Sequence, residues 1–429
     1  SFNSVSTVSD SKNFKSFEIN NYFYRKFYML FHFGFYSSLL LISFSQGILY
    51  SVLLLIKAIR TENKSNYWLS LFIFLCSLYI APWMLGFAGW YDNQPYRDIL
   101  FYLPLQHLLF IGPIIFFYTQ SLLNPSFKFT KKEALHLIPG LLYLLYITTM
   151  GVYDKLILHD YYFYTNGMDK DFDNWYQKTG LVSMIIYFIL SIKYYNSYKK
   201  LMYQVVSYAD SILFKWIKTY LFAFLIMLSL PILFDSISYF FSELNSYKGS
   251  WWFFLFFSGV MYYIAIVGYS NPANASIPFK LEFNKNPILL LNDVENNNTE
   301  EAVIDIDHEI FEENISPEIQ KLKIKIETLI QSEELYKNPE LNIAEVAKKL
   351  DTNVALISKT INRGFQINFN DCINNYRIEA VKTMFANNEH GKSTLLGIAF
   401  DCGFNSKATF NRAFKKNTGK TPKEFIDTL

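Results

Sequence analysis

Two short segments near the end of the chain repeat the same residue types 53 positions apart. They are ALISKTIN at residues 355–362 and ATFNRAFK at residues 408–415. Each holds two large apolar residues four positions apart, the spacing of a core-facing pair on a helix: Ile357 with Ile361, and Phe410 with Phe414. At about 100° per residue, Lys359 and Arg412 then point about 200° away from the first core residue, into solvent.

The residues beside these two cations are of the types that read DNA. A small residue, Ala355 or Ala408, lets a helix approach the major groove, while Arg or Lys pairs with guanine and Asn with adenine. A solvated helix face is the usual alternative for Lys and Arg, but the duplication favours DNA. The predicted DNA-contacting residues are Ala355, Ser358, Lys359, Asn362, Ser406, Lys407, Ala408, Asn411, Arg412 and Lys415.

The first segment is the second helix of a predicted helix–turn–helix motif. The stretch LNIAEVAKKLDTNVALISKTINR gives a short helix that begins after Asn342, a turn, and a second helix capped by Thr352. A helix upstream begins at Ser316, which precedes a proline at the first helical position. A long helix over about 368–387 follows the motif, and its length of about 27–30 Å would set two recognition helices about one DNA turn apart.

The second segment is likewise the second helix of a predicted helix–turn–helix motif. A helix over 394–402 stops at Gly403, which can adopt the left-handed conformation, and Phe404 enters the core. Ser406 starts the recognition helix, and Thr421-Pro422-Lys423-Glu424 forms a capping box with proline at the first helical position. Because the first recognition helix has only Lys359 on its reading face, we expect the second motif to contribute more affinity.

The charge and the short motifs of the chain indicate which ligands and reactions to expect. Residues 321–429 hold 17 Lys and Arg against 12 acids, a net charge of +5 that suits phosphate contacts. The three cysteines lie far apart without a Cys/His cluster, so we expect no zinc site, no disulfide and no cofactor. No HExxH, GxSxG or Walker A motif occurs, and we expect no enzymatic activity.

The first 270 residues have the composition of a membrane protein. The whole chain is 51% hydrophobic and 19% aromatic. A bilayer core of about 30 Å needs about 20 apolar residues per helix. We predict an all-α protein with a seven-helix transmembrane bundle, whose spans are 28–56, 67–90, 100–122, 134–153, 181–198, 218–241 and 250–269.

Lysine and arginine indicate the orientation of this bundle. The first, third and fifth connections carry eleven Lys and Arg, and the second, fourth and sixth carry five. The positive-inside rule then places the N-terminus outside and the C-terminus in the cytoplasm. Lys12, Lys15, Arg25 and Lys26 in the N-terminal tail argue the other way.

A few polar residues within the spans are candidates for a signal pocket. His32, His107 and Asp235 lie in the outer halves of their predicted helices, where Asp235 could pair with a histidine. Hydrogen bonding that only holds the bundle together is the open alternative. Trp175 lies in the long fourth connection, 153–178, which suits either a ligand-binding lid or an aromatic belt at the membrane interface.

Composition divides the chain into four parts. Residues 1–27 form an N-terminal tail, 28–270 the membrane domain, 271–316 an acidic flexible linker and 317–429 the soluble domain. Residues 291–320 hold ten acids and no Lys or Arg, which is typical of a solvated linker. An alternative role is competition with DNA for the basic domain that follows.

Residues 341–425 resemble the C-terminal DNA-binding domain of the AraC/XylS family of bacterial transcription regulators. The resemblance is carried by IAEVAKKL and ISKTINRGFQINFNDCINNYRIEAV, and by IAFDCGFNSKATFNRAFKKNTGKTPKEF. The second copy has the family's Ser-x-x-x-Phe-x-Arg-x-Phe-Lys-Lys run, and the first departs from it with Ile361 in place of an aromatic residue. The resemblance implies a cytoplasmic double helix–turn–helix domain that binds promoter DNA as a dimer or at tandem sites.

The leading hypothesis is a one-component regulator of transcription in the bacterial cytoplasmic membrane. The membrane domain would sense a small-molecule or membrane-borne signal, and the soluble domain would bind double-stranded DNA and act on the transcription machinery. Two alternatives are release of the soluble domain by proteolysis within 271–316, and a transporter or membrane enzyme with an appended regulator.

Overall fold

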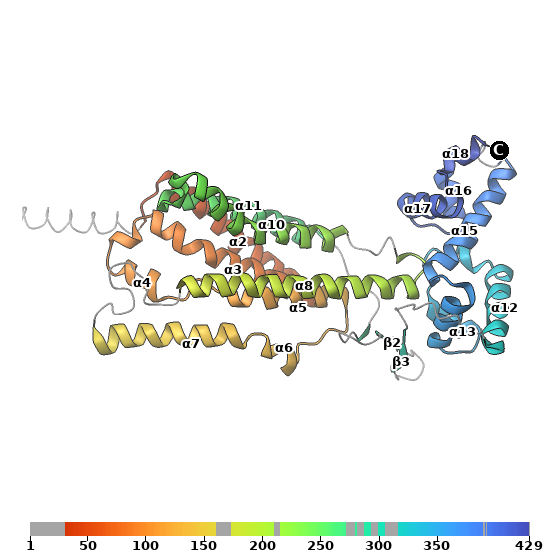
Figure 1. Cartoon of the computed structure of the whole chain (residues 1–429), viewed down its shortest axis with the longest axis horizontal. Coiled ribbons are helices and arrows are strands. Elements are labelled where there is room, and N and C mark those ends of the chain that lie inside the picture. Colours follow the sequence, from red (N-terminus) through yellow and green to blue (C-terminus); the bar gives the residue numbers. More distant parts are fainter. Residues whose placement is uncertain are drawn as a thin grey trace, which may run out of the picture. The chain divides into compact units, whose positions relative to one another are not determined.

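The computed structural model describes residues 31–159, 173–209, 215–271, 279–280, 287–292, 299–304, 316–388, 391 and 393–428. The chain forms two compact units, and most of its described residues are helical (Figure 1). The first unit comprises 1–118, 129–190 and 218–272, and the second comprises 119–128, 191–217 and 273–429.

The first unit is a bundle of apolar helices. Helix α2 (Phe35–Thr61) packs against α3 (Lys64–Phe87), and α11 (Tyr247–Ser270) packs on both. Ser51 and Ser70 exchange hydrogen bonds between α2 and α3, with Oγ donating to the opposite carbonyl at 3.0 and 2.7 Å. A Cβ on Gly47 would collide with Ser77. Small residues at this helix interface therefore let the two backbones approach closely, as they do in membrane proteins.

Five helices in the described part of the chain are long and apolar enough to cross a membrane. They are α2, α3, α11, the segment 138–158 formed by α7 (Ile138–Val152) and η2 (Tyr153–Leu158), and 216–240 of α10 (Lys215–Phe240). The seven predicted spans are not all confirmed. The predicted span 181–198 lies inside the longer helix α8 (Asp173–Val205), where Lys178 and Lys193 bound the apolar stretch.

The predicted span 100–122 is wrong as one helix. The chain instead forms α4 (Tyr96–Tyr102) and the shorter apolar helix α5 (Leu108–Leu123). Leu103 is extended, with φ −80° and ψ 123°, because the following Pro104 disfavours the helical conformation of the residue before it. His107 therefore lies at the start of α5 and not within a continuous span.

The second unit contains a small antiparallel sheet that no sequence pattern predicted. Strands β1 (Phe279–Lys280), β2 (Ile288–Asn292) and β3 (Thr299–Val303) occur in this order, within the range expected to be a flexible linker. Phe279 is buried beside Tyr194 and Tyr198, and its carbonyl accepts a hydrogen bond from Asn124 Nδ2 at 2.7 Å. These aromatic contacts, together with the apolar run of β2, explain why strands form here.

The helices after residue 316 form the expected double helix–turn–helix. The first motif pairs α13 (Ile343–Lys349) with α14 (Val354–Thr360), which continues into η6 (Ile361–Phe365), and the second pairs α16 (Leu395–Asp401) with α17 (Lys407–Thr418). Helix α15 (Phe369–Ala386) joins the motifs, α12 (Pro317–Ser332) precedes them and α18 (Pro422–Ile426) follows (Figure 1).

Most predicted helix caps are confirmed. Ser316, Asn342, Ser406 and Thr421 each accept a hydrogen bond from a backbone N–H in the first turn. Thr352 does not cap α14, because Asn353 takes that position and accepts from Leu356 N at 2.7 Å. Asn is at least as good a cap as Thr.

None of the three cysteines, all of which the structure describes, forms a disulfide, and all three are buried. Their reaction with a thiol reagent therefore reports opening of the fold around them. Burial raises the pKa of Cys372 in the second unit to about 12. Because the thiolate is the reactive form, we expect Cys372 and Cys402 to resist maleimide labelling at pH 7 in the folded protein, and to react at the rate of a free thiol in denaturant. Mass spectrometry of labelled peptides measures this, and fast labelling of the native protein would contradict the packing.

Candidate nucleic-acid interface

Helix α17 presents a cationic face. Ser406 begins the helix, accepting a hydrogen bond from Thr409 N at 3.1 Å, and Thr409, Phe410 and Phe414 are buried. Packing of these three residues leaves the opposite side of the helix in solvent. The exposed residues are Lys407, Ala408, Asn411, Arg412, Lys415, Lys416 and Asn417.

The exposed face of α17 borders a groove of about 610 Å³. Leu395 and Leu396 of α16 line one part of it, and Thr421, Pro422 and Lys423 at the start of α18 line another. Lys407, Arg412 and Lys415 line it from α17. A concave surface with four cations has the charge and the shape for a nucleic-acid backbone and its groove edge.

Helix α14 presents a different face from the one predicted. Lys359 is exposed and Ala355 is half-buried, but Ser358 and Asn362 are only 2% and 5% exposed, so their predicted exposure is wrong. The reason is Val354, which is buried and lies four residues before Ser358 and eight before Asn362. These positions fall on the core-facing stripe of a helix, whereas the residue equivalent to Val354 in the second copy is the exposed Lys407.

Exposed residues that the repeat comparison missed complete the first recognition helix. Leu356, Lys359 and Arg363 follow one another at spacings of three and four, and all three are exposed. Arg363 lies in η6, which is a π-helix, so its side chain is rotated relative to that of an α-helix. The exposed stripe is found in the sequence when Val354 is included in the apolar face.

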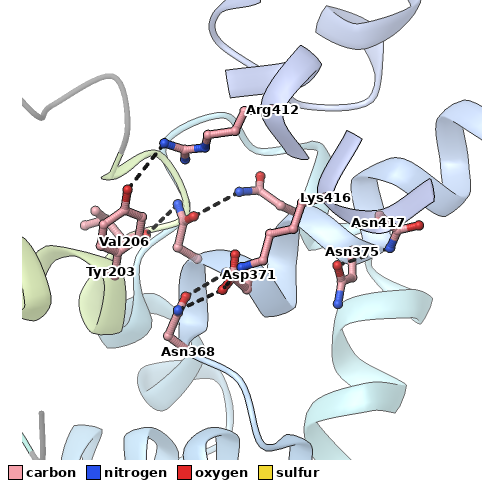
Figure 2. A network of polar contacts seen from close by, with 10 residues as sticks. Tyr203, Val206, Asn368, Asp371, Asn375, Arg412, Lys416 and Asn417 are labelled. Atoms are coloured by element: carbon pink, nitrogen blue, oxygen red, sulfur yellow. Dashed lines mark hydrogen bonds and ion pairs between the residues drawn. The ribbon is translucent and has the colours of Figure 1, made fainter. Parts of the chain in front are cut away.

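Polar contacts fix α17 against α15 (Figure 2). Lys416 Nζ lies 2.7 Å from Asp371 Oδ2, and Asn417 Nδ2 donates to Asn375 Oδ1 at 3.2 Å. Asn368 Nδ2 in turn donates to the same carboxylate oxygen of Asp371 at 2.8 Å. The second recognition helix is thereby held at the start of the connecting helix, as well as by the core that Phe410 and Phe414 share with α15.

Residues 346–428 match a family model described as a helix-turn-helix domain, of the AraC type. The C-terminal part of the chain is an AraC-type helix–turn–helix domain. The match begins within α13 and covers the rest of both helix–turn–helix motifs and α15, but not α12 or the apolar helices of the first unit. No curated protein and no solved structure is detectably similar to the chain.

The predicted signal-pocket residues are spread over the first unit. His32 precedes α2, and its backbone N–H donates to Ala88 O at 3.0 Å. His107 is half-buried beside Phe110. Asp235 on α10 and Trp175 on α8 are exposed. Among the described residues, no hydrogen bond or ion pair joins the Asp235 carboxylate to either histidine, because Asp235 points away from the packed side of α10.

A small cavity in the first unit lies elsewhere. Its volume is about 40 Å³, and none of the four predicted pocket residues lines it. The lining is mainly apolar and comes from α3, α5, α8, α10 and α11. The remaining aromatic residues of the predicted lid, 161–172, fall outside the described residues.

Mutations can show whether DNA binds the exposed stripe of α14 or the face of this helix that the repeat predicted. Arg363→Ala should reduce the slope of log affinity against log salt by about 1, as expected for one lost phosphate contact. Ser358→Ala should leave DNA affinity and the slope unchanged, because Ser358 is buried. Fluorescence anisotropy across a salt series measures both, and a loss of affinity in the serine variant alone would reverse the assignment.

Proposed function

We propose that this protein is a membrane-bound, one-component transcription regulator that binds promoter DNA through its AraC-type domain. The observation that carries this proposal is the coexistence in one chain of the AraC-type domain at 346–428 and five helices suited to a bilayer. No separate kinase or receptor is needed, because the same polypeptide holds a candidate sensor and the DNA-binding module.

In this proposal α17 is the main reading element. Arg412 pairs with guanine and Asn411 with adenine in the major groove, and Ala408 permits close approach. Lys407, Lys415 and Lys423 line the groove of the protein beside α17 and bind phosphates of the DNA. These contacts add affinity without sequence preference. Helix α14 contributes Lys359 and Arg363 at a second, adjacent groove.

The membrane unit keeps the DNA-binding domain at the cytoplasmic face, where the chromosome is accessible. A signal that binds the bundle changes promoter occupancy only when it has different affinities for two states of the protein. We place this signal outside the membrane or within it, and we propose a homodimer on DNA, since two chains then read two operator half-sites.

Chromatin immunoprecipitation of the full-length protein, combined with membrane fractionation, tests this function. We expect discrete enriched promoters, and we expect full-length protein in the membrane fraction under the same conditions. Enrichment with only a shortened, soluble fragment present would favour proteolytic release. No enrichment above a strain that lacks the protein would overturn the proposal.

A further inference from the structure

The chain directly after α8 pairs with the AraC-type domain through its backbone. Val206 forms an antiparallel bridge with Asn342, and Ser207 N donates to Leu341 O at 3.0 Å. Asn370 Nδ2 donates to Val206 O at 3.4 Å. Val206 and Ser207 are both fully buried within the second unit. The end of α8 is thus joined to this domain by one bridge and by hydrogen bonds to its backbone.

Arg377 on α15 is the centre of this contact. The residue is 1% exposed, and its guanidinium donates from Nη1 to Ser207 O at 3.1 Å and from Nη2 to Ser207 Oγ at 2.9 Å. It also donates to Tyr336 O, Asn338 O and Asn374 Oδ1. A buried charge is tolerated only when its donors find acceptors. Ser207 supplies two of the five acceptors, so the site is complete when this segment is in place.

The same segment contacts the residue proposed to read DNA. Tyr203, in the last turn of α8, lies with its hydroxyl 3.4 Å from Arg412 Nη1 (Figure 2). Its neighbour Val206 is held at the bridge with Asn342, three residues further along. The position of Tyr203 beside Arg412 therefore depends on a buried contact and not on the exposed hydrogen bond alone.

We propose that Leu341, Asn342, Asn370 and Arg377 form a docking site for the 203–207 segment of the same chain, and that the docked segment restricts DNA binding by holding Tyr203 against Arg412. This inference rests on the proposed function only for its effect on DNA. The occupant is the last turn of α8 together with Val206 and Ser207, with the serine at the position that Arg377 binds. The segment is continuous with α8, so a change in the membrane unit reaches the reading helix through it.

The expected size of the effect follows from the contacts. A protein whose binding-competent state is populated to a fraction f has an apparent dissociation constant raised by 1/f. Ser207→Ala removes the Oγ acceptor and leaves a buried guanidinium N–H unpaired, which should shift the docking equilibrium about tenfold toward release. Tyr203→Phe removes the hydroxyl that accepts the exposed hydrogen bond from Arg412 and should shift DNA affinity about twofold.

The experiment uses the full-length protein in nanodiscs of phosphatidylethanolamine and phosphatidylglycerol. Hydrogen exchange of the peptide that contains Ser207 reports docking without DNA, and anisotropy with a promoter fragment enriched in the immunoprecipitation reports binding. Ser197→Ala is the matched control, because Ser197 lies on α8 and its side chain has no hydrogen bond among the described residues. We expect Ser207→Ala to raise both the exchange rate and the DNA affinity about tenfold, and the control to change neither.

Each outcome distinguishes this inference from the proposed function. Unchanged exchange in Ser207→Ala would overturn the docking site, whatever the DNA result. Faster exchange with unchanged or weaker DNA binding would overturn the restriction of Arg412. If Arg412→Ala has no effect on DNA binding while exchange still responds to Ser207→Ala, the proposed function fails and the docking site stands.

Discussion

Replacing Arg412 by alanine is expected to weaken binding to the enriched promoter about 10- to 100-fold, the value of one bidentate contact to guanine. Arg412 lies on the exposed face of α17 and lines the groove between α16, α17 and α18. Its helix is fixed to α15 by the Lys416–Asp371 ion pair, so the side chain is presented from a supported backbone. Anisotropy titrations at fixed salt measure the loss.

Two further variants show whether the loss concerns base reading or charge. Arg412→Lys keeps the charge but cannot form the planar, bidentate pair, so it should retain only part of the affinity. Lys382→Ala removes one cation from α15, where Lys382 pairs with Glu379 at 2.8 Å, and should have little effect. Equal losses in Arg412→Ala and Lys382→Ala would show that net charge, and not α17, carries the binding.

Lys359→Ala should cost less than Arg412→Ala. The first recognition helix has a mixed exposed stripe of Leu356, Lys359 and Arg363, whereas α17 carries four exposed cations. The sequence predicted this asymmetry from the single cation on the first helix, although the repeat placed Ser358 and Asn362 on the wrong side. A larger loss for the Lys359 variant would make α14 the main reading element.

The local features of the AraC-type domain were predictable because short-range physics sets them. Caps such as Ser316 and Ser406 need only a hydroxyl three residues before a free N–H. The stop at Gly403 was predicted because glycine adopts the left-handed conformation without strain, and its φ is +93°. Each of these signals lies within four residues of the feature that it determines.

Two of the features that the sequence did not predict depend on partners far along the chain. Ser207 and Arg377 are 170 residues apart, and no periodicity or motif connects them. The burial of Phe279 needs Tyr194 and Tyr198, so an acidic, proline-rich segment looked like a plain linker. The break before His107 was a local feature, set by Pro104, and hydropathy averaged over about 20 residues concealed it.

Gly403 is where local conformation and packing both exclude a side chain. Its φ of +93° is unfavourable for any residue with a Cβ. A Cβ there would also lie 2.2 Å from Tyr336 O and 2.8 Å from Lys337 Cα, which are backbone atoms that cannot rotate away. Because Tyr336 O accepts from Arg377 Nε at 2.8 Å, displacement of Tyr336 would disturb the buried arginine as well.

Gly403→Ala should therefore destabilise the AraC-type domain by about 2–5 kcal/mol, the sum of left-handed strain and overpacking. Gly419→Ala is the matched control, since its φ is +74° and a Cβ at this position would have nothing within 4 Å, so it should cost only the strain of about 1–2 kcal/mol. Labelling of Cys372 and Cys402 across a urea series, in full-length protein with Cys76→Ala, measures the opening of this domain alone. Equal shifts in the two glycine variants would mean that the backbone of Tyr336 yields and that Gly403 is required for its conformation only.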